Sequence, residues 1–296
     1  MTSRNKRELD TVFDTRHELG EGIIWDEETE QLIWFDINNH QLFLGSPESR
    51  TYQQVQFDEP VAAGFLAPQS QLLVASASGL ICYDRQTGST APYLAIEADK
   101  PATRSNDSRT GPANSIWFGT MGRKLEAGAG CVYHVRNRQI TPLFPATSIP
   151  NATCFSQDGR LAYLADTPTR AIYKIALDEE TGLPAGEKEL FVDLAPEGLN
   201  PDGAVLDSAG RVWNAQWGAG RIACYDETGR FVEAVHLPAS QITCPCFGGP
   251  DLKTLYATSA YEGLSASEMA DQPEAGAVFA IEMDIAGLPE RRLGTL

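Results

Sequence analysis

Four side chains with oxygen donors, two carboxylates and two carboxamides, occupy the same point of a repeated sequence pattern. In chain order, the residues at this point of the six repeats are Glu21, Ala62 or Ala63, Asn106, Asn151, Asp202 and Thr243. A convergent group of oxygen donors with two negative charges is what a hard or borderline divalent cation requires. If the fold closes the repeats into a ring, these residues therefore predict one divalent-metal site at its centre.

The residues beside these donors allow two interpretations. The local sequences are Gly-Glu21-Gly, Asn106-Asp, Pro-Asn151-Ala and Pro-Asp202-Gly. Each one, taken alone, is an ordinary turn sequence. Small or turn-forming neighbours also let a side chain project from a backbone kink without crowding. Because the four donors recur in register, about a dozen residues before an apolar run, the metal site is the favoured interpretation.

The apolar runs themselves define the repeat. Six of them recur roughly every 40 to 50 residues, the period of a propeller blade. They are IWFDI (33–37), LLVAS (72–76), IWFGT (116–120), AYLAD (162–166), VWNAQ (212–216) and LYATS (255–259). Most are preceded by a polar turn and followed by a third strand such as GLICYD (79–84) or RIACYDE (221–227). Six such units predict an all-β, six-bladed β-propeller, in which the innermost strand of each blade lines the channel.

The repeats leave no internal domain boundary. We expect residues 1–296 to form one propeller domain, with residues 1–13 either a loose arm or an outer strand that closes the ring. No segment sustains helical periodicity over three turns, and only residues 262–272 could hold one helical turn.

Composition excludes several function classes. The net charge of −17 and pI of about 4.6 argue against nucleic-acid or anionic-membrane partners. The N-terminus has no apolar leader segment and no run approaches a membrane span, so we expect a cytoplasmic protein. Six scattered cysteines without a zinc-site spacing predict buried free thiols, and the four histidines show no metal-binding pattern.

Several longer phrases together resemble the regucalcin, senescence-marker and gluconolactonase (sugar-lactone lactonase) family, and bacterial sugar lactonases more than the animal protein. The resemblance covers about residues 17 to 285. The phrases that carry it are LGEGIIWDEETEQLIWFDI (19–37), RSNDSRTGPANSIWFGTMG (104–122), PNATCFSQDGRLAYLADT (150–167), NPDGAVLDSAGRVWNAQWGAGRI (200–222), CPCFGGPDLKTLYATSA (244–260) and QPEAGAVFAI (272–281).

The resemblance implies roles for particular residues. It implies one divalent metal ion on Glu21, Asn151 and Asp202, with calcium the first expectation and zinc, manganese, magnesium or iron(II) as alternatives. It implies that Arg104 and Asn106 contact a sugar lactone and that Asp202 is the general acid and base. The resemblance to calcium-dependent phosphotriesterase propellers would instead place Asn106 in the metal shell.

This chain departs from the family pattern at three places. It has Ala152 where the family usually has glycine after the asparagine, and Gly111-Pro-Ala-Asn114 where the family has an Asp-Pro-x-Gly turn. The loop 122–130 is shorter than in the animal protein, where it supplies a carboxylate that contacts substrate. Glu126 could replace that group, or Lys124 could.

The resemblance implies the hydrolysis of an aldono-1,4- or 1,5-lactone, such as glucono-, xylono- or arabinono-lactone, to the sugar acid. The metal would polarise the carbonyl, and the base would be Asp202 or a hydroxide on the metal. No Gly-x-Ser-x-Gly nucleophile motif is present. Two alternatives remain, a calcium-dependent phosphotriesterase or esterase and a non-enzymatic calcium-binding propeller. We expect a monomer or a weak homo-oligomer.

Overall fold

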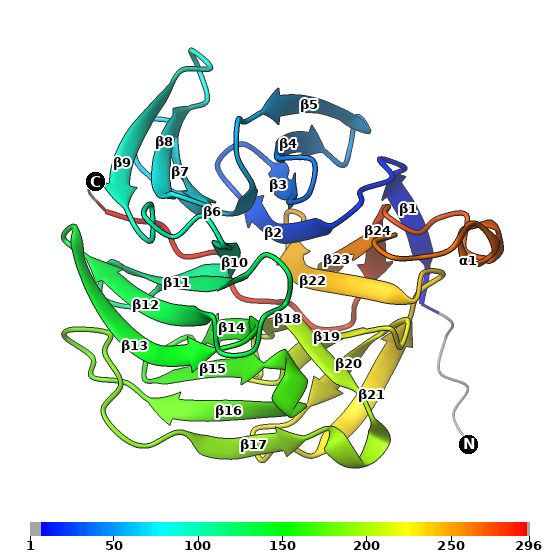
Figure 1. Ribbon diagram of the computed structural model, residues 1–296. Coiled ribbons are helices and arrows are strands. Elements are labelled where there is room, and N and C mark those ends of the chain that lie inside the picture. The colour runs from blue at the N-terminus through cyan, green and yellow to red at the C-terminus, as the bar shows by residue number, and fades with distance from the viewer. Residues whose placement is uncertain (1–6, 295–296) are drawn as a thin grey trace.

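The computed structural model describes residues 7–294, in which six four-stranded antiparallel sheets surround a common centre (Figure 1). This confirms the predicted all-β six-bladed propeller. The strands of blades one to three are β2 (Gly20–Asp26), β3 (Gln31–Asp36), β4 (Gln41–Ser46), β5 (Thr51–Gln56); β6 (Val61–Leu66), β7 (Gln71–Ser76), β8 (Gly79–Asp84), β9 (Thr90–Ala95); β10 (Thr103–Gly111), β11 (Ser115–Gly122), β12 (Gly130–Arg136) and β13 (Gln139–Thr147). Those of blades four to six are β14 (Pro150–Phe155), β15 (Leu161–Asp166), β16 (Ala171–Ala176), β17 (Glu189–Asp193); β18 (Asn200–Leu206), β19 (Val212–Trp217), β20 (Arg221–Tyr225), β21 (Phe231–His236); β22 (Gln241–Gly248), β23 (Thr254–Ala260), β24 (Val278–Glu282) and β1 (Leu9–Phe13).

The six apolar runs lie in the second strands of the blades, where they form the core. Trp34, Trp117 and Trp213 are the largest fully buried side chains, each with 0% of its surface exposed. Second strands are apolar on both faces because neighbouring blades cover them, which is why these runs do not alternate with polar residues. The apolar runs in the sequence therefore identify the strands that are buried between blades.

The N-terminal strand completes the last blade. β1 pairs antiparallel with β24, with Leu9 opposite Ile281 and Thr11 opposite Phe279, so the last blade combines both ends of the chain. Of the predicted arm or closing strand at 1–13, residues 1–6 lie outside the described residues, and Leu9–Phe13 form an outer strand.

The remaining regular elements are short. The helical turn expected within 262–272 is α1 (Ala266–Asp271), which begins at a capping box formed by Ser265 and Glu268. Two 3-10 helices, η1 (Thr167–Thr169) and η2 (Ala195–Glu197), follow β15 and β17. No helix in the described range 7–294 is long and apolar enough to cross a membrane. All six cysteines are free and five are buried, as the sequence predicts.

The C-terminal segment crosses one end of the central channel (Figure 1). Arg291 donates to the backbone of Ser156 in blade four, and the amide of Leu293 donates to Leu66 in blade two at 2.8 Å. Glu290 pairs with Arg109 of β10 at 2.6 Å, and both side chains are mostly buried. The sequence repeats give no indication of this segment, which covers the end of the channel opposite the cavity described next.

Candidate active site

Every innermost strand carries a β-bulge at the repeat position that holds an oxygen donor in four of the blades. The register shifts fall at Glu21–Ile24, Val61–Ala63, Ser105–Ser108, Asn151–Cys154, Pro201–Ala204 and Ile242–Pro245. A bulge turns a side chain out of the regular alternation of the strand, here toward the ring centre. The recurring turn-like sequences are therefore the signature of these bulges, and they occur on channel-lining strands.

Two of the bulges hold unusual backbone conformations. Gly22 has φ +60°, and a Cβ at this position would lie 2.1 Å from the carbonyl oxygen of Ala62. Ala152 has φ +56°, a left-handed conformation that costs an alanine energy that glycine avoids. Ala152, where the family usually has glycine, thus adopts a left-handed backbone conformation beside Asn151 at the cost of local strain.

The four donors line one cavity of about 310 Å³ together with Arg104. The side chains of Glu21, Asn106, Asn151 and Asp202 are buried, with 4–7% of their surface exposed. The other lining residues are Leu19, Met121, Leu125, Ile149, Thr167, Pro168, Asn200, Trp217 and Glu262. The structure therefore brings together all the predicted site residues except Glu126.

A chain of hydrogen bonds orients the polar side of the cavity. Arg104 donates to Asn106 Oδ1 at 2.8 Å, and Asn106 Nδ2 donates to Asn151 Oδ1 at 3.2 Å and to the carbonyl of Pro150 at 2.9 Å. Asn151 Nδ2 donates to Thr167 Oγ1 at 2.8 Å. Both asparagines use their side-chain nitrogens as donors in this series of hydrogen bonds. The side-chain oxygen of Asn151 therefore faces Asn106.

Glu21 of blade one and Asp202 of blade five form an interacting pair of acids. Burial, reinforced by the charge of Asp107, raises the pKa of Glu21 from 4.5 to about 8. Burial and the charge of Glu21 raise the pKa of Asp202 well above its usual range. Two such carboxylates do not both ionise readily, so the pair binds a proton or another positive charge.

Arg104 lines the cavity together with this pair. Burial lowers the pKa of its guanidinium to about 10, against the opposing charges of Glu262 and Glu21, so Arg104 stays charged at neutral pH. It supplies one positive charge to a cavity that holds the carboxyl groups of Glu21, Asp202 and Glu262. One guanidinium would not balance the charge of the pair once Glu21 and Asp202 were both ionised.

The donor chemistry of this cavity fits a hard divalent cation. Two carboxylates and a carboxamide oxygen, held at the ring centre with too little positive charge, match the ligands that calcium, magnesium and manganese prefer. Within residues 7–294 no group of three or more His, Cys, Asp or Glu side chains is arranged to hold a metal ion. The candidate set therefore depends on Asn151 as its third donor, with Glu21 and Asp202 as the charged pair.

The loop 122–130 contributes differently from the expectation. Glu126 is exposed, accepts a hydrogen bond from the backbone nitrogen of Lys124 at 2.9 Å, and does not line the cavity. Lys124 is exposed as well, and the loop instead presents the apolar side chain of Leu125. The structure thus places neither of the two suggested replacements for the family carboxylate against the cavity.

Sequence reasoning missed Glu262, which lines the cavity from the connection after β23. A signal was available. In an antiparallel hairpin, the residue that enters the first strand lies beside the residue that leaves the second. Met121, Thr167, Trp217 and Glu262 all lie at or just after the end of a second strand, and all line the cavity. Inspecting the ends of the apolar runs, as well as the bulges, would have found them.

The acid pair predicts a pH-dependent stability in chelator-treated protein. Because the pKa of Glu21 is raised in the folded state, its contribution is fully present below pH 4.5 and is lost as the pH rises toward 8. We expect Glu21→Gln to unfold at a higher temperature than the wild type at pH 8, and the difference to disappear near pH 4.5. Thermal unfolding across this range tests it; a difference that does not change with pH would contradict it.

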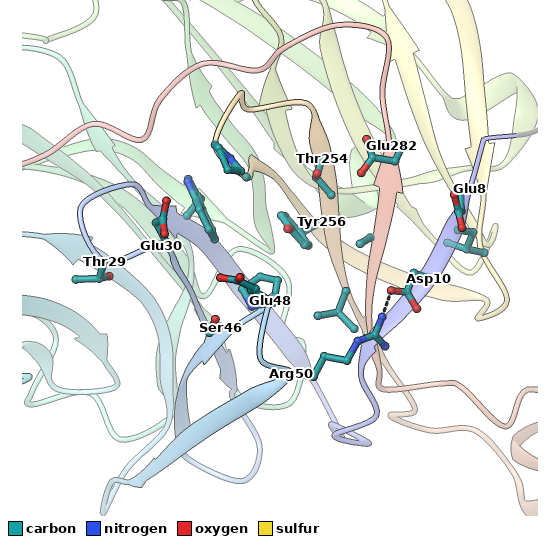
Figure 2. Close-up of a pocket in the computed structure, with 17 residues that line it drawn as sticks. Glu8, Asp10, Thr29, Glu30, Ser46, Glu48, Arg50, Thr254, Tyr256 and Glu282 are labelled. Carbon is teal, nitrogen blue, oxygen red and sulfur yellow. Dashed lines mark hydrogen bonds and ion pairs between the residues drawn. The ribbon is translucent and has the colours of Figure 1, made fainter.

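A larger groove of about 860 Å³ lies between the first and last blades (Figure 2). Figure 2 shows Glu8, Asp10, Glu30, Glu48 and Glu282 around it, with Arg50 paired to Asp10. None of the donor residues of the inner strands lines this groove. The smaller cavity, which gathers the bulge residues of four blades, is therefore the candidate active site.

The fold agrees with the comparison to known proteins. Residues 19–261 match the model of the SMP-30/gluconolactonase/LRE-like region, and the chain belongs to this family. A crystal structure from Agrobacterium tumefaciens, described as a calcium-binding protein, regucalcin, superposes with a TM-score of 0.94 at 36% identity, covering 97% of this chain and 96% of that one.

Two relatives carry names of enzymes. The 6-deoxy-6-sulfogluconolactonase of Pseudomonas putida is 33% identical over 92% of this chain and 94% of its own length. The L-arabinolactonase of Azospirillum brasilense is 32% identical over 95% of this chain and 94% of its own length. Because these matches span nearly the whole chain, they include all six blades.

Proposed function

We propose that this protein hydrolyses a sugar lactone to the corresponding sugar acid with the help of one divalent metal ion. The observation that carries the proposal is the single cavity in which Glu21, Asn151 and Asp202 lie together with Arg104. The names of the relatives, which act on different sugar lactones, support the same reaction class. We further expect a cytoplasmic enzyme that is a monomer or a weak homo-oligomer.

Glu21, Asn151 and Asp202 would hold the metal. Such an ion supplies Lewis-acid polarisation of the lactone carbonyl and stabilises the negative charge that develops on its oxygen. The two carboxylates balance its charge, and the hydrogen bond from Asn106 fixes the amide of Asn151. The regucalcin structure, described as calcium-binding, supports calcium as the first ion to test, with zinc, manganese, magnesium and iron(II) as alternatives.

Asp202 would act as general base and then general acid. Its carboxylate takes a proton from the attacking water as the new carbon–oxygen bond forms, and returns it to the ring oxygen as the ring bond breaks. Burial and the charge of Glu21 raise the pKa of Asp202 in the metal-free site, and a cation bound to the same carboxylate would lower this pKa again.

Arg104 and Asn106 would bind and orient the lactone. Arg104 remains cationic in the cavity wall and offers donors in a fixed plane to a carbonyl or hydroxyl oxygen. Its hydrogen bond to Asn106 Oδ1 holds the guanidinium in place before substrate binds. A second hydrogen bond, from Arg104 to the carbonyl of Ser105 at 2.8 Å, also holds the guanidinium, so a change in Asn106 removes one of its two hydrogen bonds.

The experiment that tests the proposal is lactone hydrolysis by chelator-stripped protein with single metals added back. Glucono-, xylono-, galactono- and arabinono-lactones are compared by a pH-indicator assay, with the uncatalysed rate subtracted. Activity that one metal restores, with a preferred sugar, would support the lactonase. Metal binding without hydrolysis of any lactone would favour the phosphotriesterase or esterase alternative, or a calcium-binding propeller without activity.

A further inference from the structure

The connection after β23 places a carboxylate in the cavity wall and fixes it from two blades. The amide of Glu262 donates to the carbonyl of Glu18 at 2.9 Å, and its own carbonyl accepts from Gln241 Nε2 at 2.9 Å. Asn38 Nδ2 donates to Glu262 Oε1 at 2.9 Å. Backbone and side chain are thus both oriented, so Glu262 is held in place in the cavity wall.

The second oxygen of this carboxylate is available to a ligand. Among the described residues, Glu262 Oε2 accepts no hydrogen bond, while the residue lines the cavity and is half-buried. Much of the remaining wall is apolar and comes from Leu19, Met121, Leu125, Ile149, Pro168 and Trp217. A carboxylate oxygen with a fixed direction in such a wall is a strong acceptor for a hydroxyl group.

We infer that Glu262 is a specificity-determining residue that accepts a hydrogen bond from a hydroxyl group of the bound lactone. This inference rests on the proposed function and adds the basis of substrate selection. A site built to bind a substrate hydroxyl rejects an analogue that lacks it, because its acceptor is then left without a partner in the closed complex. The cavity therefore selects polyhydroxylated lactones over lactones of the same ring size without hydroxyl groups.

The test compares glucono-1,5-lactone with δ-valerolactone, which has the same ring and no hydroxyl groups. We expect Glu262→Gln to raise KM for gluconolactone about 10-fold with little change in kcat, and Glu262→Leu to lower kcat/KM about 100-fold. Neither variant should lower kcat/KM for δ-valerolactone. Glu18→Gln is the matched control, because its carboxylate accepts from the same Asn38 and does not line the cavity.

The outcomes separate this inference from the proposed function. A loss confined to gluconolactone supports the role of Glu262. An equal loss with both lactones, an unchanged KM for gluconolactone, or the same effect in Glu18→Gln would overturn it while leaving the lactonase proposal in place. If the metal-loaded wild type hydrolyses no lactone, the proposed function itself fails. Glu262→Gln keeps the side-chain shape, so it tests the inference even if Glu262→Leu does not fold.

Discussion

Replacing Asp202 by asparagine is expected to lower kcat for lactone hydrolysis about 10²–10⁴-fold, the range of general acid–base catalysis. Asparagine keeps the shape of the side chain and one oxygen donor, but it cannot take the proton from water. Steady-state kinetics under saturating metal measure the loss, and a calorimetric titration shows whether metal still binds. Full activity in Asp202→Asn, with metal bound, would rule out the proton-transfer role.

The neighbouring acid Asp107 provides the matched control. It is half-buried, its charge helps to raise the pKa of Asp202, and its Oδ2 accepts from the amide of Thr153 at 2.7 Å. Asp107 does not line the cavity. Asp107→Asn removes a negative charge close to the acid pair and leaves the cavity wall unchanged, so we expect its kcat to stay within about 10-fold of the wild type. An equal loss in both variants would assign the effect to charge and not to proton transfer.

The fold was predictable because its strongest signals are local and repeated. Each blade buries an apolar second strand, and each inner strand has a bulge about a dozen residues earlier, so period and offset identify the ring and its lining residues. Glu21, Asn106, Asn151 and Asp202 were found in this way, and all four line one cavity. A repeat carries this information because every blade packs against its neighbours in the same way.

The parts that were not predicted depend on contacts between distant segments. The hydrogen-bond chain from Arg104 to Thr167 joins blades three and four, and no spacing within one blade encodes it. The C-terminal segment around Glu290 lies outside the repeat, and only its contacts with several blades show that it covers the channel. Glu126 was suggested by analogy with a longer loop, and a shorter loop presents Leu125 to the cavity instead.

Replacing Glu21 by glutamine is expected to weaken the affinity for the divalent ion at least about 100-fold, since changes to outer-shell groups alone cost 10–100-fold. Glutamine retains the length and one oxygen of the side chain but removes half of the negative charge of the acid pair. Because metal binding must displace the protons that the raised pKa values retain, the affinity of the wild type should also rise between pH 6 and pH 8.

Calorimetric titration of calcium, zinc or manganese into chelator-stripped protein measures both effects. Glu18→Gln is the control, because Glu18 lies three residues before Glu21 and its carboxylate bonds Asn38 outside the cavity. If Glu21→Gln bound the ion as tightly as the wild type, the metal would lie elsewhere, and the acid pair would remain as a protonated pair. The site would then work with the raised pKa values, and Asp202 would carry a proton. Asp202 could donate this proton to the ring oxygen, but it could not first remove a proton from water.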